Sequence, residues 1–302
     1  MGNTLQKGTL FTPQQTNELF NLVRGKSSLA ILSGSAPIPF NGKDVFRFNM
    51  DNEVNLVAES GAKANGGATV DSVSMAPVKI EYGVRVSDEF KYGAAELQLQ
   101  IFQEFTDAFA KKVARGLDIM AFHGVNPRTG SSAAMLNGKS FDSAVTNKIE
   151  FDEAHVVDNV TSAIDMIEAA EHEVTGMAMA PAMKSALAAI KTQTNSNVPL
   201  FPELGWGSTA GTLNGLPVDT NSTVSFGSNA DRAIIGNFRD YFKWGFSKDI
   251  SLEVIEYGDP DNSGRDLKGY NEVYLRGEAY IGWGIIVPDA FAKIRDEDPA
   301  SV

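Results

Sequence analysis

The amino-acid sequence predicts a mixed α+β protein, and three observations support this fold class. Apolar residues recur at steps of three and four between residues 94 and 123, which is the pattern of a long amphipathic helix. Segments 44–58 and 77–90 alternate between apolar and polar residues, as half-buried antiparallel strands do. The 302 residues are 43% hydrophobic and 21% charged, which is ordinary for a globular protein of about two domains.

The composition excludes several classes of function. The chain has no cysteine, which rules out disulfides, thiolate metal sites and a thiol nucleophile. Its net charge of −12 would repel polyanions, so tight non-specific binding of duplex DNA is not expected. No run approaches about 18 apolar residues and no signal sequence opens the chain, so we expect no membrane association.

Residues 1–40 predict a loosely organised N-terminal arm. Thr12 and Pro13 suit the start of a short helix over Gln14–Val23, which Gly25 would end. Segment 27–40 contains two prolines and reads as extended chain. An arm that cannot bury itself alone usually docks on a neighbour.

Residues 41–92 predict a long two-stranded excursion. Its strands are 44–58 and 77–90, and the second places Val78, Ile80, Tyr82, Val84 and Val86 on one face. Between them, residues 59–68 are small, polar and glycine-rich, which favours a mobile tip. An isolated hairpin is marginal in water, so this one should lean on another subunit.

Residues 94–123 give the strongest local signal. The expected inward face is formed by Phe102, Phe105, Phe109, Val113, Leu117 and Met120. Only Gly116 interrupts the helical pattern, and His123-Gly124 marks its end. At 1.5 Å per residue the helix would be roughly 45 Å long.

Short elements follow to the C-terminus. We expect helices over 151–171 and 182–191, the second opened by Pro181, and a turn at 259–264. The expected strands are 177–179, 216–218, 233–235, 242–246, 252–257, 272–287 and 290–294.

The search for chemistry predicts no catalytic, cofactor-binding or metal site, and therefore no enzyme. The three histidines form no His-Glu-x-x-His motif, and no lysine and hydroxyl pair follows the glycines of 61–67 as in a phosphate loop. Asp259–Gly264 resembles the start of a calcium loop, but its twelfth position is Tyr270, so a plain turn is the better interpretation. Trp244 and Trp283 should pack internally, whereas Trp206 is flanked by glycines and is the best candidate for an intersubunit contact.

Four stretches, in order, resemble the major capsid proteins of tailed bacteriophages, whose fold is named after phage Hong Kong 97. They are Val57–Gly61, Val78–Phe90, Leu213–Val218 together with Ile234–Phe238, and Val273–Phe291. Each stretch is short, and their ordered combination carries the resemblance over nearly the whole chain.

The resemblance implies a Hong Kong 97-type domain plan. It comprises an N-terminal arm (1–40), an extended loop or E-loop (41–92), a peripheral domain with a long spine helix (93–150), an axial domain (151–262), and a return to the peripheral domain (263–302). Contacts between subunits are expected at Phe11 and Phe20 of the arm, at Glu59, Lys63 and Arg85 of the E-loop, and at Trp206 among the axial loops. Some relatives link subunits through a Lys–Asn isopeptide bond, although a solvated Lys63 is the plainer interpretation.

By the same resemblance, the chain is expected to assemble with itself into pentamers and hexamers. These would form an icosahedral head around double-stranded DNA, built in the cytoplasm of a bacterial host and present in the virion. Scaffolding, portal and decoration proteins are the expected partners. Some relatives begin with a long cleaved scaffolding segment, and the start of this chain near the arm predicts a separate scaffold or a processed chain.

Two alternatives remain open from the sequence. The first is an encapsulin-like nanocompartment shell, which neighbouring genes for an enzyme cargo would favour. The second is an uncharacterised hydrolase or binding protein of the α+β class. Particle size separates the second from a shell subunit, since an enzyme would form a small oligomer and a shell subunit would form capsomers or particles.

Overall fold

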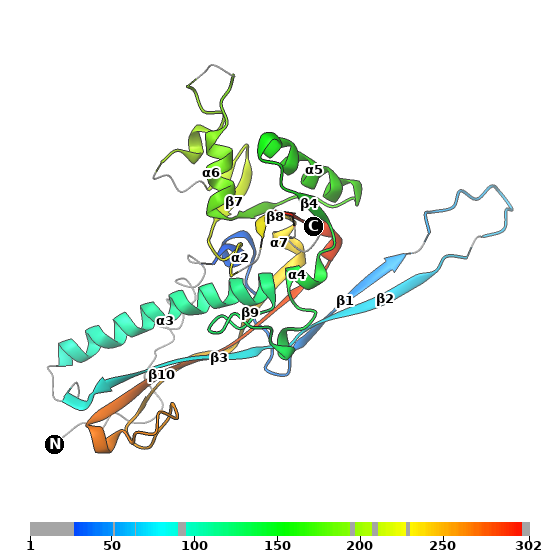
Figure 1. Cartoon of the computed structure of the whole chain (residues 1–302). Helices are drawn as coiled ribbons and strands as arrows, with labels where there is room; N and C mark the ends of the chain where they lie inside the picture. Colours follow the sequence, from blue (N-terminus) through cyan, green and yellow to red (C-terminus); the bar gives the residue numbers. More distant parts are fainter. Residues whose placement is uncertain are drawn as a thin grey trace.

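The computed structural model of the chain describes residues 27–50, 52–63, 65–89, 95–193, 197–206, 211–227 and 230–297. Within them, the strands form a two-stranded, a three-stranded and a six-stranded sheet (Figure 1). The two larger sheets each back onto a cluster of buried apolar side chains. The observed class is therefore α+β, as the sequence predicted.

A long helix and a long sheet form the spine of the molecule. Helix α3 (Ala95–His123) runs along the antiparallel sheet made of β3 (Val78–Ser87), β10 (Glu272–Ile285) and β9 (Phe242–Ile255), with β10 in the centre (Figure 1). The predicted spine helix is thus confirmed, and Gly116 does not break it. The two strands expected at 242–246 and 252–257 are one strand, which stays paired to β10 across a bulge.

Two glycines let this layer pack closely. A Cβ atom on Gly277 would lie 3.1 Å from the ring of Phe109. The glycine therefore leaves the space in which this buried phenylalanine of α3 packs against β10. A Cβ atom on Gly83 of β3 would collide with the ring of Tyr274, which belongs to the paired strand β10. Both positions therefore need glycine for close approach and not for an unusual backbone angle.

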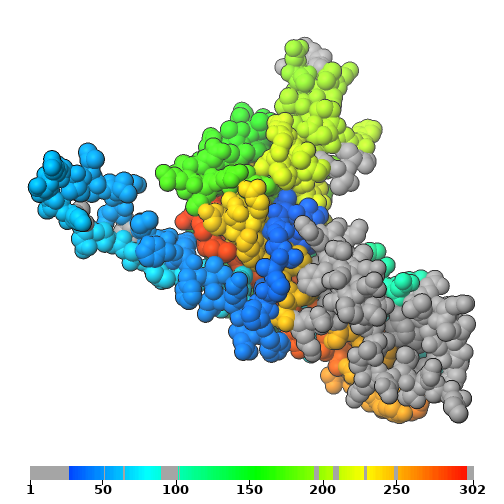
Figure 2. Space-filling view, turned by 180° about the vertical axis from the view of Figure 1, so that it is seen from behind, coloured from blue at the N-terminus to red at the C-terminus, as the bar shows by residue number. Residues whose placement is uncertain are grey.

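The region expected to be the E-loop (41–92) contains a hairpin whose strand pairing differs from the prediction. Strand β1 (Lys43–Met50) pairs antiparallel with β2 (Ala68–Met75), from Lys43 opposite Met75 to Met50 opposite Ala68. The pairing expected between 44–58 and 77–90 is wrong, because β3 leaves the hairpin and pairs with β10 instead. The alternation in 77–90 correctly predicted a strand, but alternation does not indicate which strand it pairs with. Figure 2 shows the hairpin standing clear of the body of the molecule.

The region expected to be the axial domain (151–262) contributes β5, β6, β7 and β8 to the six-stranded sheet, whose order is β4-β11-β8-β5-β7-β6 and which we call the axial sheet. These strands are β4 (Lys148–Glu150), β5 (Gly176–Met179), β6 (Thr212–Leu213), β7 (Leu216–Thr220), β8 (Asp231–Gly236) and β11 (Phe291–Arg295). Helices α5 (Val156–Ala169) and α6 (Pro181–Ala189) pack on it through the second cluster. The C-terminal region expected to return to the peripheral domain (263–302) is therefore divided: β10 lies in the spine sheet, whereas β11 lies between β4 and β8 in the axial sheet.

The segment 27–40 is not the wholly extended arm that the sequence predicted. Ser28–Leu32 forms helix α2, whose first three residues are buried, and two of them, Leu29 and Ala30, belong to the same cluster as the spine helix. Beyond it, the amide of Ala36 donates to the carbonyl of Trp244 over 2.8 Å, so the chain runs along β9. A Cβ atom on Gly245 would lie 1.7 Å from the carbonyl oxygen of Ala36, which makes this glycine the crossing point.

The remaining elements are single turns. They are the helices α4 (Phe141–Ala144) and α7 (Phe238–Tyr241) and the 3₁₀ turns Ala134–Leu136, Glu153–His155, Pro202–Leu204, Lys268–Tyr270 and Pro288–Ala290. Phe141 of α4 is fully buried and contacts Phe122, Phe238, Phe242 and Phe291. This aromatic group lies where the spine meets the axial domain. Trp244 and Trp283 are buried too, as predicted.

Phe109→Ala should destabilise the free subunit by about 3–5 kcal/mol, because it opens a cavity between α3 and β10 that Gly277 cannot fill. Urea unfolding followed by circular dichroism measures this. Phe46→Ala is the matched control, since that ring is exposed and its removal should change unfolding by less than about 0.5 kcal/mol. An unfolding midpoint for Phe109→Ala equal to that of Phe46→Ala would contradict the packing described.

Candidate assembly surfaces

One face of the E-loop hairpin is apolar and uncovered. Strand residues with alternate numbers share a face, and directly paired residues share it across the hairpin. Phe46, Phe48 and Met50 therefore lie together with Val70, which pairs with Phe48. Their exposed fractions are 72%, 63%, 79% and 62%. We call these four residues the apolar hairpin face.

Beyond the paired Val45 and Val73, the opposite hairpin face is polar. Arg47 lies opposite Asp71, and their side chains form an ion pair of 3.7 Å. At the root, Met75 is buried against Gly284 of β10, where a Cβ atom would lie 2.6 Å from the methionine side chain. The hairpin is thus anchored at one end and amphipathic beyond it.

The connection between β1 and β2 carries further exposed apolar residues. Val54 and Leu56 are 97% and 98% exposed, as if no other part of the described chain were near. Glu59 and Lys63 lie in the same connection and are exposed as well, near a tight turn in which Gly61 donates to Ala58 over 2.8 Å. The two predicted contact residues are therefore accessible, and the structure adds two apolar neighbours.

A second uncovered apolar group lies in the axial loops. Trp206 follows the 3₁₀ turn Pro202–Leu204 and is fully exposed, and its role as an intersubunit contact stays a prediction. Val198 and Leu200 in the same loop region are also exposed. Figure 1 shows this region at the end of the axial domain beyond α6, far from the hairpin.

Asp118 ties three distant segments together inside the molecule. Its carboxylate accepts hydrogen bonds from the side chain of Ser27 (2.5 Å) and from the backbone amides of Ser28 (3.0 Å) and Leu29 (3.3 Å) at the start of α2. It also accepts from Asn221 (3.2 Å) and Thr223 (3.0 Å) of the axial domain. Because the side chain is wholly buried, these five donors take the place of water around it.

Burial raises the pKa of Asp118 to about 6, and the hydrogen bonds from Ser27 and from the α2 backbone counteract part of that rise. The folded protein therefore holds a proton at this site more tightly than the unfolded chain, in which an aspartate titrates near 3.9. It follows that the contribution of this group to stability increases as the pH falls through about 6.

A second buried polar group joins the end of α3 to the axial sheet. Asp142 of α4 contacts Nδ1 of His123 (2.9 Å) and accepts from the ammonium of Lys293 on β11 (2.9 Å). Burial alone would raise the pKa of Asp142, but the bond with His123 and the charge of Lys293 hold it below its ordinary value. Burial and the nearby Asp142 raise the pKa of Asp231 on β8 to about 7.

His123, Asp142 and Asp231 are the residues that come nearest to a metal site in the described part of the chain, with ligand atoms within 4.8 Å of one another. The buried ammonium of Lys293 already supplies a positive charge to Asp142 there. The carboxylates are thereby balanced by a side chain of the same protein. The arrangement fits a structural charge cluster between two domains.

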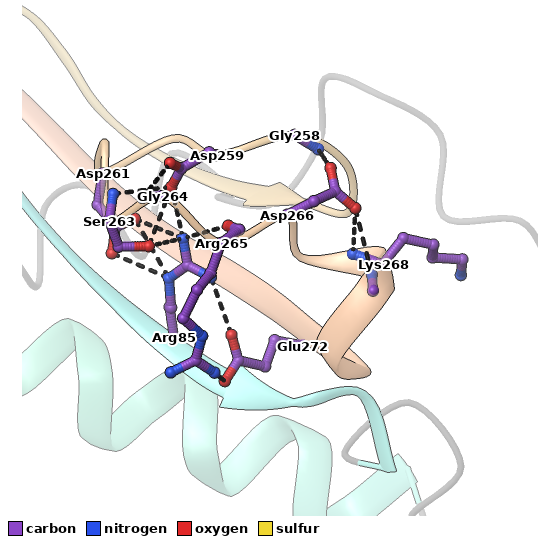
Figure 3. A network of polar contacts seen from close by, with 11 residues as sticks. Arg85, Gly258, Asp259, Asp261, Ser263, Gly264, Arg265, Asp266, Lys268 and Glu272 are labelled. Carbon is purple, nitrogen blue, oxygen red and sulfur yellow. Dashed lines mark hydrogen bonds and ion pairs between the residues drawn. The ribbon is translucent and has the colours of Figure 1, made fainter.

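Arg85 is not an E-loop residue, so its predicted place is wrong. It lies on β3 in the spine sheet, where its guanidinium reaches Asp259, Asp261 and Glu272 near the β9–β10 connection (Figure 3). The hydrogen bond from Arg85 lowers the pKa of Asp261. The sequence misplaced Arg85 because it assigned β3 to the hairpin.

The structure separates the predicted contact residues. Glu59 and Lys63 lie in the hairpin connection and Trp206 in the axial loops, all exposed, whereas Arg85 is engaged within its own chain. Phe11 and Phe20, and the helix expected at 14–23, lie outside the described residues. Sequence reasoning missed Asp118, which looks like any polar helix residue, and it missed the uncovered face, although alternation at Phe46, Phe48 and Met50 signalled it.

The described residues contain no helix that is both long and apolar enough to cross a bilayer. The family model of the phage capsid family matches residues 7–296. The chain belongs to the phage capsid family. It is a major capsid protein, a structural subunit of the phage head.

Solved structures of phage proteins share the fold of this capsid protein. A chain of Mycobacterium phage Ogopogo is 27% identical with a TM-score of 0.77, over 98% of this chain and 97% of that one. A chain of Gordonia phage Cozz is 23% identical with a TM-score of 0.73, over 90% and 87%. The capsid of a native GTA particle is 14% identical with a TM-score of 0.62, over 99% and 94%. No curated protein matches the chain significantly. The predicted Hong Kong 97-type fold is confirmed.

Asp118→Asn should lower the stability of the free subunit at pH 7.5 by about 1–3 kcal/mol, because the amide turns hydrogens toward Asn221 or Thr223. Asparagine does not titrate, so the stability gap to the unaltered protein should widen by on the order of 1–2 kcal/mol between pH 7.5 and 4.5. Urea unfolding at several pH values measures both effects. A gap that stays constant with pH would rule out the raised pKa.

Proposed function

We propose that this capsid protein assembles into pentamers and hexamers that close into an icosahedral shell around double-stranded DNA. The observation that carries the proposal is the apolar hairpin face, together with Val54 and Leu56. These residues are too exposed to be satisfied within one subunit. The hairpin is anchored at Met75, and its polar face is held by its own ion pair, so the apolar face is free to cover a neighbouring copy.

The domain plan supports contacts at two separate places on each subunit. The hairpin stands away from the body, and the loops next to α6 lie at another end of the molecule (Figure 1). We infer that the axial loops meet around the centre of a capsomer, while each hairpin covers the peripheral domain of the next subunit. Many weak contacts that act at once give a stable closed assembly.

The charge of the chain suits a container for DNA. A net charge of −12 is compatible with a wall that does not adsorb packed polyanion. The proposal needs no sequence-specific binding of DNA and no catalytic step. It extends to a scaffolding protein, a portal and decoration proteins as partners, to assembly in the cytoplasm of the host, and to contacts through Phe11 and Phe20 of the N-terminal arm.

The double substitution Val54→Ser with Leu56→Ser should reduce the yield of shells at least tenfold and leave the fold of the subunit unchanged. Each side chain is almost fully exposed in the free subunit, so its loss removes no internal contact. In a shell, the same change would remove roughly 1.5–3 kcal/mol of apolar burial per side chain at every copy of the contact. Size-exclusion chromatography with light scattering, on protein expressed with its scaffold, measures the shell fraction.

Asn55→Ser is the control, because it changes the residue between the two without altering apolar surface. Circular dichroism and urea unfolding of the subunit should be the same for all three proteins. Normal shell yield from the double variant would refute the assigned role of the hairpin connection. A monomer under every condition, for the unaltered protein as well, would refute assembly itself.

A further inference from the structure

The connection between β9 and β10 has the residue spacing of a calcium loop. Calcium loops place oxygen ligands at positions one, three and five, a glycine at six for the sharp turn, and a backbone carbonyl at seven. Here Asp259, Asp261 and Ser263 fall at the first three of these positions. Gly264 follows with φ +79°, and the carbonyl of Arg265 takes the seventh position.

All four oxygens converge on one atom, which belongs to Arg85 on the neighbouring strand β3 (Figure 3). Nη2 of Arg85 lies 2.7 Å from Oδ1 of Asp259 and 2.5 Å from Oδ1 of Asp261. It also lies 2.6 Å from Oγ of Ser263 and 2.9 Å from the carbonyl oxygen of Arg265. The position at which a calcium loop would hold its ion is therefore filled by a positively charged nitrogen from outside the loop.

Four oxygens around one guanidinium nitrogen are more acceptors than that nitrogen can use for hydrogen bonds. One such nitrogen carries two hydrogens, so at most two of the four oxygens accept well-directed bonds. The remaining oxygens are held near the charge by the loop itself, because Asp259 accepts from the backbone amides of Ser263 (3.0 Å) and Gly264 (2.7 Å). The loop is thus shaped to surround a compact cation.

The positive charge of Arg85 also balances the carboxylates of the loop, so their charge balance does not need a metal ion. A calcium loop completes its ligand set with a bidentate glutamate at the twelfth position, which is Tyr270 here. The carboxylate that does lie nearby, Glu272, accepts from Nη1 of Arg85 (2.9 Å) and from Arg265 (2.7 Å). It therefore reinforces the arginine at that place.

We propose that Asp259–Arg265 is a calcium-type cation loop whose cation is the guanidinium of Arg85. The loop then closes the outer end of the spine sheet without any metal ion, and it stays closed in the presence of a chelator. Removal of the arginine turns the loop into a calcium site. This inference stands on the contacts of one subunit and does not depend on the proposed mode of assembly.

The experiment compares the thermal unfolding of three full-length subunits in 10 mM calcium and in EDTA. The unaltered protein should unfold at the same temperature in both. Arg85→Ala should unfold at a lower temperature in EDTA, and calcium should raise its midpoint by roughly 3–8 °C, as expected for a site with a dissociation constant on the order of 10⁻⁴–10⁻³ M. Arg85→Ala combined with Asp261→Ala should lose the calcium response, because the oxygen ligand at the third position of the loop is gone. Magnesium should shift Arg85→Ala less than calcium does, since it dehydrates reluctantly.

Two results would overturn the inference. One is an Arg85→Ala protein that is folded by circular dichroism and has equal midpoints in calcium and EDTA. The other is an unaltered protein that calcium stabilises as strongly as the variant. If Arg85→Ala is insoluble in EDTA, calcium during refolding should restore soluble subunit, and failure of that rescue would count equally against the inference.

Discussion

A single buried carboxylate holds the parts of this capsid protein in one body. Asp118 of the spine helix receives donors from the start of α2 on one side and from the axial residues Asn221 and Thr223 on the other. A charge without water is costly, so each of these segments must stay in place for the others to be satisfied. The spine helix, the chain that emerges from the arm and the axial domain thus meet at one point, and the hairpin and the loops project from this fixed frame.

Apolar side chains are covered around this buried carboxylate and uncovered on the hairpin. Residues around Asp118 and Phe141 are covered on all sides, whereas the hairpin beyond Met75 has one apolar face in water. A globular enzyme would hide such a face under another element of its own chain. A shell subunit can leave it open because the neighbouring copy supplies the cover. The hairpin stands clear of the body, so on the proposed assembly that cover comes from outside the subunit (Figure 2).

The sequence was sufficient for the elements that periodicity determines. Helix α3, strands β3, β5 and β10, and the burial of Trp244 and Trp283 follow from local pattern alone. The partner of a strand does not follow from local pattern, because Val78–Ser87 and Ala68–Met75 are both plausible partners for β1. The choice between them depends on two distant contacts, the packing of Met75 against Gly284 and the pairing of β3 with β10. Helix α2 was missed since its five residues are too few to show a period. Arg85 was misplaced with its strand, and the roles of Asp118 and the Asp259 loop depend on partners that lie about 90 and 176 residues away in the sequence.

Hydrogen exchange of the hairpin, in free subunits and in assembled shells, tests the central claim most directly. The claim is that a neighbouring copy covers the apolar hairpin face and the connection that follows it. Amides of residues 52–63 and 65–67 form no part of a strand in the subunit, so they should exchange rapidly there. In shells, the account predicts at least a tenfold slowing across this connection, with buried spine residues such as Phe109 and Val113 unchanged. Equal exchange of the connection in both states would contradict the account, because the hairpin would then be as uncovered in the shell as it is in the single subunit.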